Sequence, residues 1–335
     1  MEFTNIINQI GNTPLIKLKQ VSDLTGCNIY GKAEYFNPGE SVKDRAALYI
    51  VKDALNKKLI EKGGIIVEGT AGNTGIGLAV VCKEFDLKLK IVIPKTQSIE
   101  KKNTLKKLGA ELIEVDAVPY SNPNNYIKQS KRIAEELSKN HNHGVVWGNQ
   151  FDNTVNTQAH IETTANEIWT QTSGDIDGFT CAVGTGGTLS GGSIGLKNKS
   201  KNIKIALSDP MGSSLYSYVK NKKLESSGSS ITEGIGTGRI TKNFEKAIID
   251  DAFQTDDTEA LKIVFNLIET QNIILGGSSG INIAGAIKLA KKLGKGKNIV
   301  TILCDDGRRY ASKIFNKEFL KSKNLPIPKW LQNLT

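Results

Sequence analysis

The chain has 335 residues, of which 39% are hydrophobic and 23% charged, and its 44 basic and 34 acidic side chains give a formal net charge of +10. This composition excludes a disordered, collagen-like or coiled-coil protein and leaves enough apolar residues for a sizeable core. Without a run of about 18 apolar residues, or a basic and apolar leader at Met1–Asn5, we expect neither a membrane span nor a secretory signal.

Apolar, β-branched runs alternate along the chain with longer amphipathic stretches. The expected strands lie at 64–69, 89–94, 111–115, 145–147, 179–183, 204–208 and 298–303. The expected helices lie at 76–85, 99–108, 125–139, 157–170, 257–270 and 280–292. Between them, 226–240 is rich in Ser, Gly and Thr and is expected to form a long polar loop. Strands separated by helices of this length indicate βαβ units and parallel sheets.

The rhythm of strands and helices breaks at 148–150, which divides the chain into two α/β lobes. We expect a smaller lobe at 45–149, a larger lobe made of 1–44 and 150–320, and a C-terminal extension at 321–335. Each lobe is expected to hold an open, twisted, mostly parallel sheet flanked by helices. Ligands bind such sheets at the carboxyl ends of their strands, so the cleft between the lobes is the expected site.

Three glycine-rich turns follow or precede predicted elements, at 68–75, 184–188 and 276–280. Glycine lets the backbone turn tightly and aim its N–H groups at an anion, and a following helix N-terminus adds its dipole. None of the turns matches a Walker loop or a dinucleotide fingerprint. Together they predict an anionic cofactor that carries no nucleotide.

A lysine stands in a distinctive place, within Asn37-Pro-Gly-Glu-Ser-Val-Lys43-Asp-Arg-Ala-Ala. An isolated lysine is usually a solvated surface charge. Lys43, however, follows a Gly/Pro turn beside Ser41 and precedes an amphipathic helix. That position suits a lysine that loses its proton and attacks a carbonyl to form a Schiff base.

The remaining reactive residue types show no pattern of their own. The cysteines lie far apart at Cys27, Cys82, Cys181 and Cys304, and the three histidines have no metal-ligand spacing. We therefore expect no metal site, and reduced thiols in a cytoplasmic protein. The lysines are spread along the chain and are not interleaved with aromatic residues, so no nucleic-acid partner is expected.

Five segments carry a family resemblance, and they are Gly11–Leu15, Asn37–Arg45, Thr70–Gly75, Gly184–Thr188 and Gly276–Gly280. In this order and spacing they resemble the cysteine synthase (O-acetylserine sulfhydrylase) and cystathionine β-synthase family of fold-type II pyridoxal-phosphate enzymes. The resemblance covers about residues 5–315. It implies the fold of the tryptophan synthase β-subunit type, a pyridoxal 5′-phosphate cofactor and an active site between the lobes.

The resemblance also implies a role for individual residues. Lys43 holds the cofactor aldehyde as a Schiff base and then removes the Cα proton of the substrate. Asn73 contacts the 3′-hydroxyl of the cofactor, and Ser278 faces its pyridine nitrogen. The residues that surround the cofactor phosphate are Gly184, Thr185, Gly186, Gly187 and Thr188. The residues that bind the substrate are Thr70, Ala71, Gly72, Asn73, Thr74, Gln150 and Gly234.

The implied reaction is β-replacement, making L-cysteine from O-acetyl-L-serine and sulfide or another thiol through an aminoacrylate. A serine hydroxyl at the ring nitrogen leaves the ring a weaker electron sink than a carboxylate would, which favours β-elimination. Three residues depart from the usual family pattern, namely Ala71 for serine, Glu233 for an amide and Arg239 for an apolar residue. We expect Glu233 and Arg239 to add charge at the mouth of the cleft. Cys304, which replaces a frequent proline, is expected to be a structural thiol.

Other functions remain open at this stage. L-cysteine desulfhydrase uses the same intermediate but releases sulfide, pyruvate and ammonia, and cystathionine β-synthase is a further alternative. Ala46, Thr74, Thr185 and Thr188 argue against a serine/threonine dehydratase. The resemblance implies a homodimer that can dock the C-terminal tail of serine acetyltransferase in its cleft. Intact Lys43, Asn73 and Ser278 argue against a scaffold without catalytic activity.

Overall fold

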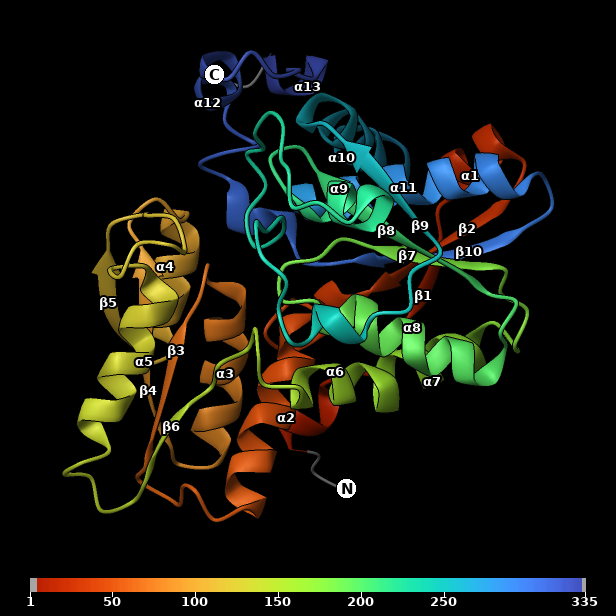
Figure 1. Cartoon of the computed structure of the whole chain (residues 1–335). Helices are drawn as coiled ribbons and strands as arrows, with labels where there is room; N and C mark the ends of the chain where they lie inside the picture. The colour runs from red at the N-terminus through yellow and green to blue at the C-terminus, as the bar shows by residue number, and fades with distance from the viewer. Residues whose placement is uncertain (1–4, 333–335) are drawn as a thin grey trace.

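Two open sheets of different size stand beside each other, with helix α2 (Lys43–Asn56) between them (Figure 1). This computed structural model describes residues 5–332. Residues 1–4, most of the segment examined for a secretory signal, lie outside the described residues. So do residues 333–335 of the expected C-terminal extension. Within 5–332, no helix combines the length and the apolar character needed to cross a bilayer.

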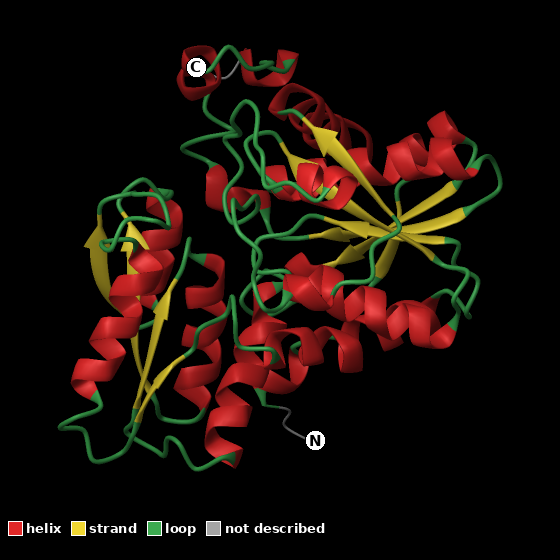
Figure 2. Ribbon diagram, viewed as in Figure 1, coloured by secondary structure: helices red, strands yellow, loops and turns green. Residues whose placement is uncertain are grey.

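The smaller sheet is wholly parallel, in the order β5-β4-β3-β6. Its strands are β3 (Ile65–Gly69), β4 (Lys88–Pro94), β5 (Glu111–Val115) and β6 (Val145–Trp147). Its helices are α3 (Asn73–Glu84), α4 (Ile99–Lys107) and α5 (Tyr126–Leu137). Along β3 the side chains alternate, so that Ile66 packs with Ile76 of α3 while Ile65 and Val67 pack with Ala134 of α5. Both faces of the sheet are therefore covered by helices (Figure 2).

The larger sheet has the order β1-β2-β10-β7-β8-β9, and β1 pairs with β2 in the antiparallel direction. Its strands are β1 (Leu15–Lys17), β2 (Asn28–Ala33), β7 (Gly178–Cys181), β8 (Lys204–Pro210), β9 (Asp251–Thr255) and β10 (Asn298–Leu303). Along β10, Val300 and Ile302 join one core cluster and Ile299 and Leu303 another, as alternation in a doubly covered strand requires.

Helices cover the larger sheet on its two faces (Figure 2). On one side lie α1 (Lys19–Thr25), α10 (Asp257–Gln271) and α11 (Gly277–Leu293). On the other lie α6 (Val155–Ala159), α7 (Ala165–Gln171) and α8 (Gly187–Lys199). The remaining α-helices are α9 (Leu215–Asn221), α12 (Lys317–Ser322) and α13 (Lys329–Gln332). The last two pack near α10, where the rings of Trp330 and Phe265 lie 6.0 Å apart.

The expected fold class is confirmed: two mostly parallel sheets are flanked by helices. The loop expected at 226–240 is also confirmed, since no helix or strand lies between α9 and Phe244. The lobe boundaries at 44/45 and 149/150 stay predictions.

Several expected element boundaries are wrong. The helix expected at 76–85 begins at Asn73, and the helix expected at 280–292 begins at Gly277. In both places residues of the glycine-rich turn themselves form the first turn of the helix. The helix expected at 157–170 runs from Val155 to Gln171 and includes a π-helical turn at His160–Thr164. Strands β1, β2 and β9 were not expected, because β1 has only three residues and the other two include polar side chains.

Candidate active site

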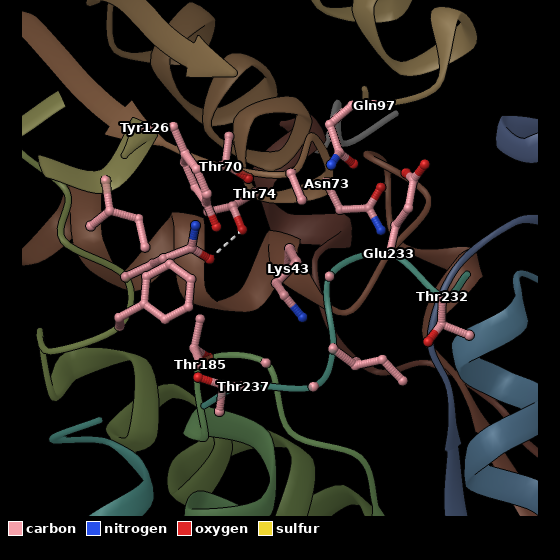
Figure 3. Close-up of a pocket in the computed structure, with 18 of the residues that line it drawn as sticks. Lys43, Thr70, Asn73, Thr74, Gln97, Tyr126, Thr185, Thr232, Glu233 and Thr237 are labelled. Carbon is pink, nitrogen blue, oxygen red and sulfur yellow. Dashed lines mark hydrogen bonds between the residues drawn. The ribbon is translucent and has the colours of Figure 1, made fainter. Parts of the chain in front are cut away.

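A cavity of about 750 Å³ opens at the carboxyl ends of strands from both sheets. Thr70 follows β3, Gly184 lies just beyond β7, and Cys304 follows β10, and all three line it. Lys43, from the start of α2, and the loop 232–239 also line it. Figure 3 shows Lys43 between Thr74 on one side and Thr185 and Thr237 on the other. The cavity is thus where ligands bind in open α/β sheets.

Lys43 is held by the turn that precedes it. The Asn37 side chain donates to the carbonyl oxygens of Glu34 at 2.9 Å and Ser41 at 3.1 Å, and the Val42 N–H donates to the Cys304 carbonyl at 2.9 Å. Within residues 5–332, the Lys43 amine makes no hydrogen bond or ion pair, and it points into the cavity (Figure 3). A primary amine in this setting is free to react with a carbonyl.

The turn 70–74 leads from β3 into α3 and presents its residues to the cavity. Its Gly72 has φ +124°, and a Cβ there would lie 2.7 Å from Lys101 Cδ, so this position requires glycine. The Thr70 hydroxyl accepts from the Gly72 N–H at 3.0 Å. The Thr74 hydroxyl donates to Gln150 Oε1 at 2.6 Å. The N-terminus of α3 and these side chains suit the carboxylate of an amino acid.

Asn73 connects this turn to the larger lobe. Its side-chain nitrogen donates to Asp305 Oδ2 at 2.6 Å, and its side-chain oxygen accepts from Arg309 at 2.9 Å. The other carboxylate oxygen of Asp305, Oδ1, is buried and has no hydrogen-bond partner among the described residues. These two partly buried hydrogen bonds fix the Asn73 amide at the cavity wall, to which Lys43 also belongs (Figure 3).

The turn 184–188 opens helix α8 and packs closely against its neighbours. Gly186 has φ +93°, and a Cβ there would lie 2.6 Å from the Phe244 nitrogen. The Thr185 hydroxyl accepts from Asn156 at 2.9 Å, and the Thr188 hydroxyl lies 3.2 Å from His160 Nε2. Burial lowers the pKa of His160 to about 3, so its imidazole is neutral. A helix N-terminus that offers two threonine hydroxyls, and glycines that let a ligand approach the backbone N–H groups closely, is suited to phosphate.

Ser278 and Cys304 lie on the side of the cavity formed by α11 and β10. Ser278 is in the first turn of α11 and is largely buried. Burial raises the pKa of the Cys304 thiol to about 11, so the thiol is protonated at neutral pH. Asn282 donates to its sulfur at 3.1 Å. These contacts support a structural role for Cys304 rather than a nucleophilic one.

The structure brings most of the predicted site residues together. Ten of them line the cavity, namely Lys43, Thr70, Ala71, Asn73, Thr74, Gln150, Gly184, Thr185, Gly234 and Ser278. Gly186 and Thr188 line a small recess that shares Lys43, Gly184 and Thr185 with it. Gly72 and Gly187 line neither. Their individual roles stay predictions.

Other residues of the cavity wall had no distinguishing signal in the sequence. Gln97, Lys101, Tyr120 and Tyr126 all line it. Lys101 stands in a run of lysines that is typical of a solvated helix face, and the turn at Gln97 has no motif. Asp305, which accepts from Asn73, is different. It follows the last strand of the larger sheet, and this place at a strand end could have identified it as a residue of the site.

The expectation that Glu233 adds charge at the mouth of the cleft is wrong. Its side chain is only 6% exposed and forms ion pairs with Lys101 and Lys313. Arg239 does line the cavity, but it pairs with Asp152 and lies over the ring of Tyr120, with 4.3 Å from Cζ to the ring centroid. Both residues therefore form contacts within the wall of the site.

A buried carboxyl group lies beneath the cavity. Glu68, in β3, accepts from the backbone and side-chain nitrogens of Gln150 at 3.4 Å each. Burial raises its pKa to about 8, against the hydrogen bonds that lower it. The folded state therefore favours the protonated form, whereas the unfolded chain ionises near pH 4.5.

This carboxyl group predicts a pH-dependent stability. Between the two pKa values the folded state binds more protons than the unfolded state, so stability falls as pH rises from about 4.5 to about 8. From about pH 6 to pH 8 the contribution is about 2 kcal/mol. Glu68→Gln should remove this loss of stability. Urea unfolding of the wild-type protein and the variant, at pH 6 and at pH 8, measures the difference. If the free energy of unfolding changed equally between the two pH values in both proteins, the effect would not come from Glu68.

Among the described residues, no group of three or more His, Cys, Asp or Glu side chains could hold a metal ion. A family model for pyridoxal-phosphate dependent enzymes matches residues 6–305. Cysteine synthase 1 of Neurospora crassa is 51% identical over 330 residues, which cover 96% of this chain and 86% of that protein.

Two solved structures share the fold. An O-acetylserine dependent cystathionine β-synthase from Helicobacter pylori superposes with a TM-score of 0.84 and 32% identity, covering 93% of this chain and 98% of that one. A hydrogen sulfide-producing enzyme from Fusobacterium nucleatum has a TM-score of 0.82 and 35% identity, covering 92% of this chain and 100% of that one.

Proposed function

Because the chain belongs to the family of pyridoxal-phosphate dependent enzymes, we propose that it is a cysteine synthase. It makes L-cysteine from O-acetyl-L-serine and sulfide: the Cβ–O bond breaks, acetate leaves, and sulfur forms a new bond to Cβ. One observation carries this proposal. The unpaired Lys43 amine lies in one cavity with two backbone turns that suit anions, one for a phosphate and one for an amino-acid carboxylate.

The residues present fit pyridoxal 5′-phosphate. Lys43 would bind its aldehyde, Gly184–Thr188 its phosphate, Asn73 its 3′-hydroxyl and Ser278 its ring nitrogen. The fit rests on the free amine, on the close-packed glycine turn at the start of α8 and on the hydroxyl of Ser278. When bound, this cofactor supplies an electron-withdrawing ring that accepts the electron pair left at Cα.

The side chains of the protein do the binding and the proton transfer. The turn Thr70–Thr74, with Gln150, binds the substrate carboxylate and so orients Cα toward Lys43. The Lys43 amine, once free, accepts the Cα proton as a general base. Ser278 offers a neutral hydroxyl instead of a carboxylate, which favours loss of the acetate group over side reactions of a full carbanion.

The proposal is tested with purified protein loaded with pyridoxal phosphate. O-acetylserine and sulfide should yield cysteine and acetate in equal amounts, measured by chromatography of the product mixture. A second incubation, with cysteine alone, measures the release of sulfide, pyruvate and ammonia. Absence of cysteine formation in the first incubation would refute the proposal.

A cysteine desulfhydrase is the second candidate, and the similarity to a hydrogen sulfide-producing enzyme favours it. The two functions differ in whether a thiol or water completes the reaction. The ratio of kcat/KM for cysteine formation to that for sulfide release decides between them. If release dominates by more than about tenfold, about 1.4 kcal/mol of transition-state preference, the chain is a desulfhydrase.

Cystathionine β-synthase activity is the other alternative, and the similarity to the Helicobacter pylori enzyme supports testing homocysteine as the thiol. We further propose a cytoplasmic homodimer. The tail of serine acetyltransferase is a candidate ligand of the cleft, since the turn Thr70–Thr74 suits a peptide carboxylate as well as an amino acid.

A further inference from the structure

A buried ion pair joins the loop 232–239 to the smaller lobe. Glu233 Oε2 accepts from Lys101 Nζ at 2.7 Å, and the two side chains are 6% and 1% exposed. Lys101 belongs to α4, which packs with the smaller sheet. The second carboxylate oxygen of Glu233 accepts from Lys313. A pair this deeply buried is costly to break, since loss of one partner leaves a buried charge uncompensated.

Glu233 also reaches the substrate turn through a neutral side chain. With its amide nitrogen turned toward both oxygens, Gln97 donates to Glu233 Oε2 at 2.9 Å and to the Ala71 carbonyl oxygen at 3.0 Å. Figure 3 shows Gln97 and Glu233 on the side of the cavity where Asn73 lies. Glu233 Oε2 thus accepts hydrogen bonds from both Lys101 and Gln97, and Gln97 in turn holds Ala71.

Lys101 supports the same turn in two further ways. Its aliphatic chain packs against Gly72, where a Cβ would lie 2.7 Å from Lys101 Cδ. Its amine donates to the Tyr310 hydroxyl at 3.0 Å, which in turn donates to Asp305 Oδ2 at 2.6 Å. Asp305 Oδ2 also accepts from Asn73. Three successive residues of the turn, at 71, 72 and 73, are therefore connected to the Glu233–Lys101 pair.

We propose that Glu233 is a positioning residue for the substrate carboxylate, acting through Lys101 and Gln97 on the turn 71–73. This inference rests on the proposed function of the cavity. A turn held in place before the substrate arrives loses little conformational freedom when the carboxylate binds. When sulfide reacts, the amino-acid skeleton is already held in the site, so capture of its carboxylate no longer contributes to kcat/KM for sulfide.

The main test is Glu233→Gln, which keeps the shape of the side chain and removes its charge. In the two-step reaction, kcat/KM for O-acetylserine reports the first half alone and kcat/KM for sulfide reports the second. We expect the former to fall by about tenfold or more and the latter to change by less than about twofold. A loss of folded protein would instead lower both by the same factor.

Two readouts are independent of turnover. The Kd of L-alanine, an amino acid without a leaving group, should rise by about tenfold in Glu233→Gln by calorimetry. Amide hydrogen exchange of the segment 70–74 should become faster in the same variant. Gln97→Ala removes the hydrogen bonds of Gln97 to Ala71 and to Glu233 but keeps the Glu233–Lys101 ion pair. It should therefore weaken L-alanine binding several-fold without lowering the melting temperature.

Glu100→Gln is the matched control. Glu100 lies on α4 beside Lys101 and also crosses to the larger lobe, where its carboxylate accepts from the Ser312 N–H and hydroxyl at 2.8 Å each. Among the described residues its carboxylate forms no hydrogen bond or ion pair with 70–74, so both kcat/KM values and the Kd of L-alanine should stay unchanged.

Two outcomes overturn the inference: an equal loss in both half-reactions of Glu233→Gln, or an unchanged Kd for L-alanine in both Glu233→Gln and Gln97→Ala. Failure of the wild-type protein to make cysteine is a different result. It refutes the proposed function, whereas the binding of L-alanine still tests the positioning of the turn.

Discussion

Lys43→Ala should lower kcat for cysteine formation by about a thousandfold or more, since the side chain serves both to bind the cofactor aldehyde and to move the Cα proton. No other described residue places an unpaired primary amine in the cavity, because the remaining lysine of its wall, Lys101, is paired with Glu233. Steady-state assays with O-acetylserine and sulfide measure the loss.

A spectroscopic readout accompanies this prediction. Wild-type protein loaded with pyridoxal phosphate should be yellow, and borohydride should attach the cofactor permanently to the peptide that contains Lys43, as mass spectrometry detects. Lys52→Ala, on the exposed face of the same helix, is the control and should retain both activity and colour. Full activity in Lys43→Ala would show that another group performs this chemistry.

Glu34→Ala should destabilise the folded protein by about 3 to 5 kcal/mol, because it leaves a buried guanidinium with half of its partners. Arg45, two residues after Lys43, is 1% exposed, and its guanidinium forms paired hydrogen bonds with Glu34 at 2.7 Å and with Glu167 at 2.6 and 2.8 Å. Glu34 itself is fully buried. Burial raises the pKa of Glu167, but its hydrogen bonds and ion pairs with Arg45 and Lys32 outweigh this effect and lower the pKa to about 2.

Urea unfolding at a fixed, saturating concentration of pyridoxal phosphate measures this loss. Asp53→Asn provides the comparison, since it removes the ion pair between Asp53 of the same helix and Lys57, the residue that follows its last turn. The Lys57 side chain is 60% exposed. Exposed pairs of this kind contribute about 0.3 to 0.5 kcal/mol. Comparable effects of the two substitutions would mean that the Arg45 cluster does not anchor the start of α2.

Local patterns in the sequence were sufficient for the elements of the smaller lobe. The strands at 111–115 and 145–147 have the expected bounds, because each run is too short for a helix, contains β-branched or aromatic residues and is bounded by turn residues. The N-terminal strands were less visible. β2 reads Asn-Ile-Tyr-Gly-Lys-Ala. Its Lys32 is buried because side chains far along the chain satisfy its amine, Glu167 at 2.6 Å and Gln171 at 3.0 Å.

The sequence by itself determined the chemistry of the site. The glycine turns at 70–75 and 184–188 and the lysine at 43 are local motifs, in which the residue types and their spacing already specify tight turns, helix N-termini and a reactive amine. These motifs predicted an anionic cofactor and a Schiff-base lysine, and their resemblance to a known family implied pyridoxal phosphate and the class of reaction.

Only the tertiary structure decided which charges support that site. Glu233 and Lys101 are separated by 132 residues, and either one alone has the pattern of a solvated charge. Their burial and pairing arise because two sheets bring α4 and the loop 232–239 together at one cavity wall. An ion pair depends on distance and burial in space, and single-sequence patterns report only neighbours along the chain.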